Sequence, residues 1–91
     1  MPTIAEWLTI DKEQVIEGLR QAQEKLEMAS GELVLDFSGV QRIEPGAIRE
    51  LEALAGIADR RKVKLGLSGV NVAVYKVLKL VRLAPRFSFL T

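Results

Sequence analysis

Two short apolar segments, separated by one helical pattern, do most to constrain the fold of this chain. Residues 33–35 form a continuous apolar run, which is typical of a central strand covered on both faces, and apolar residues alternate with others over 63–67. Between them, Pro45 suits the first turn of a helix, and apolar residues recur at helical spacing to about Asp59. Strands of one sheet that are joined by a single helix run parallel. The sequence therefore predicts an α/β fold with a mostly parallel sheet.

The N-terminal part of the chain predicts one more helix and an edge element. Residues 3–10 predict either a short strand or a segment packed over the sheet edge. An apolar stripe over 12–29 predicts a helix that starts at a capping box of Asp11 and Gln14, and Gly31 suits its end.

The C-terminal part predicts a third helix and a last short strand. Asn71 can cap the helix, Pro85 marks its end, and apolar residues over 87–90 suggest the strand. The basic side of this helix could meet an acidic partner or nucleic acid, but a solvated face is the favoured interpretation. We expect Ala73, Val77, Leu80, Val81 and Ala84 to face inward and Lys76, Lys79, Arg82 and Arg86 to face water.

In total, about four strands and three or four helices form a single domain, residues 1–91.

Composition argues against several classes of function. Without cysteine or histidine, the chain lacks thiolate nucleophiles, Cys/His metal sites and the usual proton-transfer side chain, so we expect no enzyme, no metal and no cofactor. The chain has 13 basic and 12 acidic residues, a net charge of +1, and we expect the two signs to be interspersed. Such a distribution gives no overall electrostatic field that would recruit nucleic acid or an anionic membrane. There is no leader pattern and no apolar run of about 20 residues, the length that spans a bilayer. We therefore expect a cytoplasmic chain without direct membrane insertion.

The stretch LVLDFSGVQRIEPGAIREL is similar to the signature of STAS domains, the bacterial anti-sigma-factor antagonists. In that family an apolar strand ends in Asp-x-Ser-Gly-Val, and the chain reaches Asp-Ser-Ser-Gly before a helix. The resemblance covers about 32–90, through VKLGLSGV and NVAVYKVLKLVRL, whereas the N-terminal third matches poorly. It implies a small STAS-like fold in which the N-terminal strand region is shortened.

The important departure from the family lies at the start of the second helix. Matching Asp36, Ser38 and Gly39 to the signature places Glu44 at the family's acidic position and Pro45 at its phosphorylated serine. Proline has no hydroxyl to accept phosphate, so we expect no phosphorylation there. Ser38 is a weak alternative site, because its expected role is to bond its own backbone in the turn.

The resemblance implies a non-catalytic protein-interaction domain in a bacterial signalling system that regulates transcription. An anti-sigma factor or a kinase-like protein is the first candidate partner, and the alternative is an accessory subunit of an ABC transporter ATPase. The residues expected to bind the partner are Ser38, Gly39, Glu44, Pro45, Gly46 and Arg49. The exposed half of the second helix, with Arg49, Glu50, Glu52 and Asp59 around Ala53 and Gly56, would extend this surface.

Two further interpretations depend on single features. A receiver-like domain is a remote alternative, because Asp36 ends a strand but no acidic pair ends an earlier strand to bind magnesium. A homodimer is a second prediction, because the short N-terminal region could leave a sheet edge uncovered and unpaired edges readily pair with another chain.

Overall fold

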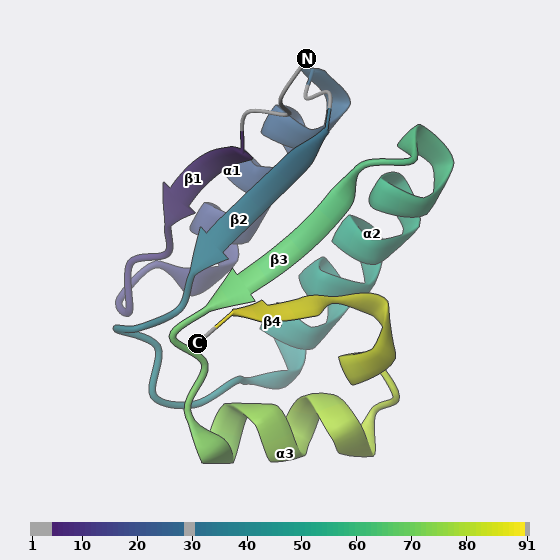
Figure 1. Ribbon diagram of the computed structural model, residues 1–91. Coiled ribbons are helices and arrows are strands. Elements are labelled where there is room, and N and C mark those ends of the chain that lie inside the picture. Colours follow the sequence, from purple (N-terminus) through teal and green to yellow (C-terminus); the bar gives the residue numbers. More distant parts are fainter. Residues whose placement is uncertain (1–4, 29–30, 91) are drawn as a thin grey trace.

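The computed structural model describes residues 5–28 and 31–90, which form a sheet with helices packed on it (Figure 1). The strands are β1 (Ala5–Thr9), β2 (Glu32–Asp36), β3 (Lys64–Ser68) and β4 (Ser88–Leu90), and the helices are α1 (Val15–Met28), α2 (Pro45–Arg61), α3 (Val72–Leu80) and the short 3-10 helix η1 (Ala84–Arg86). Every neighbouring strand pair is parallel, and the order is β1-β2-β3-β4. The predicted α/β architecture, a parallel sheet of four strands, is confirmed.

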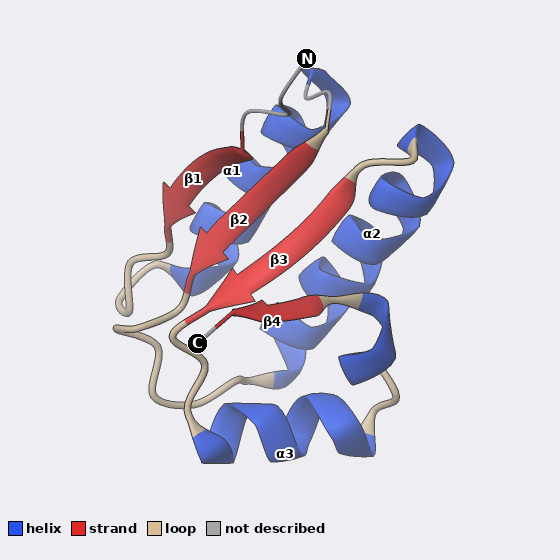
Figure 2. Ribbon diagram, in the orientation of Figure 1, coloured by secondary structure: helices blue, strands red, loops and turns tan. Residues whose placement is uncertain are grey.

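The main core lies between the sheet and the two long helices. Figure 2 shows α1 and α2 on the same face of the sheet, behind β2 and β3. Leu33 and Leu35 of β2 are fully buried in this core. Val34 points to the opposite face, where it lies in register between Trp7 and Gly66. Val34 is only 1% exposed, so β2 is buried on both faces as predicted, although both long helices lie on one face of the sheet.

The N-terminal segment forms a strand, which decides between its two predicted states. β1 pairs with β2 from Ala5 opposite Glu32 to Thr9 opposite Asp36. Ile10 continues the contact, because its N–H donates to the Asp36 carbonyl at 3.0 Å and its side chain is buried. Residues 3 and 4 of the predicted segment lie outside the described residues.

Helix α1 begins three residues later than predicted. Asp11 forms a turn of its own: its Oδ1 accepts from the Glu13 N–H at 2.8 Å, and its carbonyl accepts from the Gln14 N–H at 3.1 Å. The helical hydrogen bonds start with the Gly18 N–H donating to the Gln14 carbonyl at 2.9 Å. Asp11 therefore begins a turn that precedes the helix and does not cap the helix in a capping box, because its side chain accepts from the Glu13 N–H within that turn. The predicted end at residue 29 lies outside the described residues, and Gly31 after it has φ 105°, which suits glycine.

Helix α2 starts at Pro45 as predicted and ends two residues beyond Asp59, at Arg61. Its end is a left-handed turn at Lys62 (φ 57°), where the Lys62 N–H donates to the Asp59 carbonyl and the Val63 N–H donates to the Ala58 carbonyl. This pair of bonds is a Schellman motif, which usually has glycine at the left-handed position.

Helix α3 starts at the predicted cap but buries a different side. The Asn71 side chain accepts from the Val74 N–H at 2.7 Å. Val74 and Leu78 are fully buried, whereas Leu80 is 82% exposed. Of the five residues predicted to face inward, Ala73, Leu80 and Val81 are exposed, Val77 is half-buried and only Ala84 is buried. The apolar residues on α3 outnumber those that the core can cover, so periodicity alone did not identify the buried side. The four basic residues face water as predicted.

Candidate functional site

The loop between β2 and α2 is anchored at its first two residues. Phe37 is fully buried, and its N–H donates to the Ser68 carbonyl at 2.7 Å, which ties the loop to the end of β3. Asp36 Oδ1 accepts from the Ser38 N–H at 2.9 Å. This bond and one from the Ser38 side chain hold the pKa of the Asp36 carboxyl below its ordinary value of 3.8. Asp36 therefore anchors the turn that opens the loop.

Two residues after β3 support the same loop, and sequence reasoning did not assign them to the site. Gly69 has φ 72°, and a Cβ atom built on it would lie 2.9 Å from the Ser38 Cα. The Asn71 amide donates to the Gln41 carbonyl at 3.1 Å and to the Val40 carbonyl at 3.4 Å. From the sequence, Asn71 was predicted only as a helix cap, because the contacts of both residues with the loop join positions about 30 apart in the sequence.

The start of α2 is exposed and lacks a side-chain cap. Glu44 occupies the N-cap position with an extended backbone (φ −97°, ψ 161°), and its carbonyl accepts from the Ile48 N–H at 3.1 Å. Its carboxylate lies 3.8 Å from the Arg42 guanidinium, and both side chains are largely exposed. An ion pair this open to water contributes little to stability. Pro45 follows as the first residue of the helix and is also exposed.

Gly46 differs from the other predicted partner-binding residues, because α1 packs against it. A Cβ atom on Gly46 would lie 2.9 Å from Ile16 Cδ1, so the glycine permits a close approach of the two helices. Gly46 is half-buried for this reason. The remaining five predicted residues, Ser38, Gly39, Glu44, Pro45 and Arg49, are all exposed and belong to the loop or to the first turns of α2.

The exposed side of α2 is smaller than the sequence suggested. Glu50 is turned toward α1, where its carboxylate accepts from the Gln23 side chain at 2.7 Å and lies 3.7 Å from Arg20. Asp59 is bonded to Arg86 near the far end of the helix. The exposed side chains on the first half of α2 are therefore those of Pro45, Arg49, Glu52 and Ala53.

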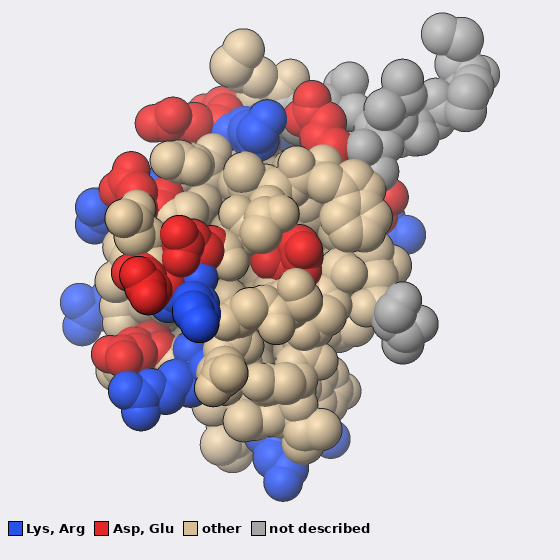
Figure 3. Space-filling view, turned by 90° about the vertical axis from the view of Figure 1, so that its left-hand side faces the viewer, with Lys and Arg blue, Asp and Glu red and all other residues tan. Residues whose placement is uncertain are grey.

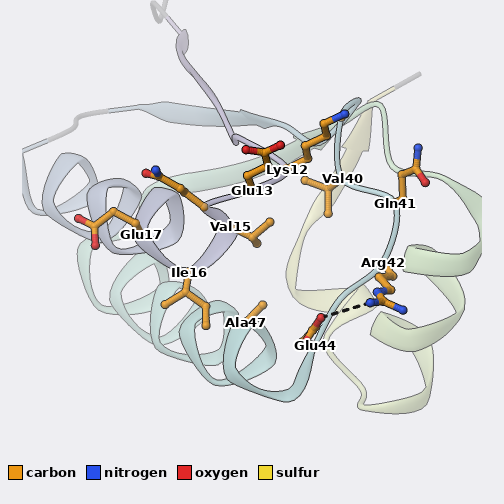
Figure 4. Close-up of a pocket in the computed structure, with 12 residues that line it drawn as sticks. Lys12, Glu13, Val15, Ile16, Glu17, Val40, Gln41, Arg42, Glu44 and Ala47 are labelled. Carbon is orange, nitrogen blue, oxygen red and sulfur yellow. Dashed lines mark ion pairs between the residues drawn. The ribbon is translucent and has the colours of Figure 1, made fainter.

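A cavity of about 700 Å³ separates the loop from the turn before α1. Figure 4 shows Val15, Val40 and Ala47 turned toward this space, with the Arg42 and Glu44 pair on one side of it. The residues that line it are Lys12, Glu13, Gln14, Val15, Ile16, Glu17, Gly39, Val40, Gln41, Arg42, Glu44 and Ala47. Lys12, Glu13 and Gln14 reach this cavity because they precede α1, in the segment that the sequence had assigned to the helix itself.

A family model described as "Mlab, STAS domain" matches residues 9–90, which is most of the chain. The chain belongs to the STAS domain family. The proposed resemblance over 32–90 is therefore confirmed, and the match includes α1, which the sequence resemblance covered poorly. No curated protein matches this chain.

A solved structure supports the same fold for this STAS domain. The crystal structure of a candidate anti-sigma factor antagonist from Thermotoga maritima matches with a TM-score of 0.66 and 19% sequence identity. The match covers 98% of this chain and 74% of that chain. At this identity the similarity shows the arrangement of strands and helices alone. It does not show which residues of this chain bind a partner.

Within residues 5–28 and 31–90, no cluster of three or more His, Cys, Asp or Glu residues is placed to hold a metal ion. STAS domains are generally non-catalytic. No helix in the described part of the chain is both long and apolar enough to cross a membrane.

Proposed function

We propose that this STAS domain is a non-catalytic regulatory module that binds a partner protein without phosphorylation at residue 45. The observation that carries the proposal is the exposed start of α2, where Glu44 and Pro45 stand beside the 700 Å³ cavity. The hydroxyl of the family's serine is replaced by a proline ring. The partner surface consists of the five exposed residues, Ser38, Gly39, Glu44, Pro45 and Arg49.

The cavity adds a second feature that suits protein binding. Its apolar residues, including Val15, Val40 and Ala47, lie among charged residues of both signs. Interfaces commonly combine an apolar centre with a polar rim, and a few buried anchors supply most of the binding energy. An apolar side chain of the partner would enter this cavity, while Glu44 and Arg42 contact polar groups around it.

Site-directed photo-crosslinking tests the position of the surface. A photoreactive amino acid is placed at Arg49, and in a control variant at Lys25, which is exposed on α1 away from the loop. We expect a partner from native lysate to crosslink to position 49 and to be lost when Glu44→Arg is added. Equal crosslinking from both positions, or a complex indifferent to Glu44→Arg, would contradict the proposed surface.

The dependence on phosphorylation is tested separately. Binding of an anti-sigma factor or kinase-like partner should not change with ATP or phosphatase, because residue 45 accepts no phosphate. A Pro45→Ser variant supplies the missing hydroxyl, and we expect it to gain phosphate from such a kinase and then to lose binding. An ATP-sensitive complex of the unmodified chain would count against the proposal.

An accessory subunit of an ABC transporter ATPase is the alternative, and the absence of a phosphoacceptor at residue 45 is compatible with it. The same crosslinking experiment separates the two, because the transporter alternative requires an ATPase and its membrane components among the captured proteins. An anti-sigma factor or kinase-like protein in that place supports the transcription-regulatory role.

A further inference from the structure

The near-neutral net charge hides a strong separation of charge along the chain. Residues 1–59 contain five basic and twelve acidic residues, a net charge of −7, whereas residues 60–91 contain eight basic residues and no acidic residue, a net charge of +8. The expectation of interspersed charges is therefore wrong. A marked difference in charge between two parts of a chain points to interaction with an anionic partner.

The fold converts this separation in sequence into a separation in space. Because the strand order β1-β2-β3-β4 follows the sequence, β1 and β4 form opposite edges of the sheet, and α3 lies beside β4 (Figure 1). The Tyr75 ring of α3 packs edge-on against Phe89 of β4, with ring centroids 5.1 Å apart. Figure 3 shows the left-hand side of Figure 1, where acidic side chains lie over the upper, left and central parts of the face with basic ones among them, and basic ones lie at the bottom.

Helix α3 exposes basic and aliphatic side chains on one side. Val72, Lys76 and Leu80 are spaced four residues apart and so form one line along the helix. Val72 is 69% exposed and Leu80 is 82% exposed, while Val74 and Leu78 hold the other side in the core. Lys79 is exposed next to this line, and within the described residues neither lysine pairs with a carboxylate.

This combination favours a lipid surface over the other anionic partners. Basic residues that flank exposed aliphatic side chains on a helix suit a bilayer with anionic headgroups, which attracts the charges while the aliphatic groups enter the interface. Single-stranded nucleic acid is less suited, because successive bases stack on several aromatic rings and α3 carries a single one, Tyr75, which is 40% exposed and contacts Phe89 with its ring.

We propose that α3 docks this domain on the surface of an anionic phospholipid bilayer. Lys76, Lys79 and Arg82 contact the headgroups, and Val72 and Leu80 enter the headgroup region. The docking is peripheral and needs no helix that crosses the membrane. It is independent of the partner surface at the start of α2, which consists of other residues.

Vesicle sedimentation tests the proposal directly. The full chain is mixed with vesicles of phosphatidylcholine alone and with vesicles of equal parts phosphatidylcholine and phosphatidylglycerol. We expect binding to the anionic vesicles only. The Lys76→Gln/Lys79→Gln pair should weaken binding roughly twenty-five-fold, because each basic residue near an anionic surface contributes about five-fold. The matched pair Arg20→Gln/Lys25→Gln removes the same charge from exposed positions on α1, away from α3, and should leave binding almost unchanged.

A second variant separates insertion from attraction between charges. Leu80→Ser keeps every charge, and because Leu80 is 82% exposed the variant should fold normally, which circular dichroism verifies. We expect it to bind anionic vesicles several-fold more weakly. Failure of the unmodified chain to bind anionic vesicles overturns the proposal. Equal loss of binding in the α3 pair and the α1 pair, or no effect of Leu80→Ser, also overturns it. Binding of an acidic protein through α3 without binding to vesicles also overturns it.

Discussion

Gly69 and Ser38 are in backbone contact across the ends of β3 and β2: a Cβ atom on Gly69 would lie 2.9 Å from both the Cα and the Cβ of Ser38. The position of the candidate site therefore depends on a residue outside its own loop. Ser38 stays where it is because Gly69 has no side chain and adopts a left-handed conformation, and Asn71 adds hydrogen bonds to the following carbonyls.

We expect Gly69→Ala to destabilise the protein by about 2–4 kcal/mol, since it combines a left-handed alanine with an overpacked contact. The free energy of unfolding in urea measures this. Gly39→Ala is the matched control, because no atom lies within 4 Å of a Cβ built on Gly39. The control should change stability by less than about 0.5 kcal/mol. Similar losses in both variants would show that the Ser38 contact is not the cause.

Asn71 has two roles that substitutions can separate. Asn71→Ala removes both the cap of α3 and the bonds to Val40 and Gln41, and should cost about 2 kcal/mol. Asn71→Asp keeps an oxygen for the Val74 N–H but cannot donate to the two carbonyls, so it should cost less. Hydrogen exchange over 40–44 should accelerate in both variants, and exchange at the start of α3 only in the alanine variant. If hydrogen exchange over 40–44 is unchanged in both variants, the bonds from Asn71 to Val40 and Gln41 do not stabilise the loop.

The carboxyl of Asp36 should make folding depend on pH. Its pKa is lowered in the folded chain by the hydrogen bonds from Ser38, so the charged form stabilises the fold. This contribution is fully present above the ordinary pKa of about 3.8 and is lost as the pH falls through the lower folded value. An NMR titration of Asp36 measures the folded pKa directly. In Ser38→Ala the backbone bond remains, so the pKa should rise only part of the way toward its ordinary value; a full return would assign the whole effect to the hydroxyl.

The end of α2 offers a stabilising substitution. Lys62 is left-handed at φ 57°, which disfavours a residue with a side chain, so Lys62→Gly should raise the free energy of unfolding by about 0.5–1 kcal/mol. Arg61→Gly, one residue earlier and inside the helix, should lower it by about as much. Thermal and urea unfolding of the pair provide the measurement. A loss of stability in both variants would mean that the left-handed turn carries no strain.

Self-association stays a prediction, and the structure identifies β1 as the strand edge through which two copies would pair. Among the described residues, β1 pairs with β2 alone, so its outer edge is open, and Trp7 on it is 59% exposed. If β1 pairs with a second copy, sedimentation should detect a dimer at high concentration, and Trp7→Glu should shift it to monomer. A monomer at every concentration would remove this prediction.

The fold was largely predictable because its signals are local. Apolar runs separated by single helices required parallel strands, Asp36 and Ser38 formed the expected turn, and Pro45 started its helix. The site was predictable only in part. Glu50 looked free on its helix but contacts Gln23 of α1, and the cavity includes Lys12 from a distant segment. Such contacts have no counterpart in local spacing.

The amino-acid sequence by itself determined the alternation of strands and helices, the turn chemistry after β2 and the absence of a hydroxyl at residue 45. Each of these depends on residues a few positions apart, whose backbone preferences and hydrogen bonds act locally. Only the tertiary structure decided which side of α3 is buried and that Gly69 supports Ser38. These outcomes depend on which surfaces meet when distant segments pack, and α3 had more apolar residues than the core could cover. The excess, Val72 and Leu80 among basic residues, became the exposed side of the helix.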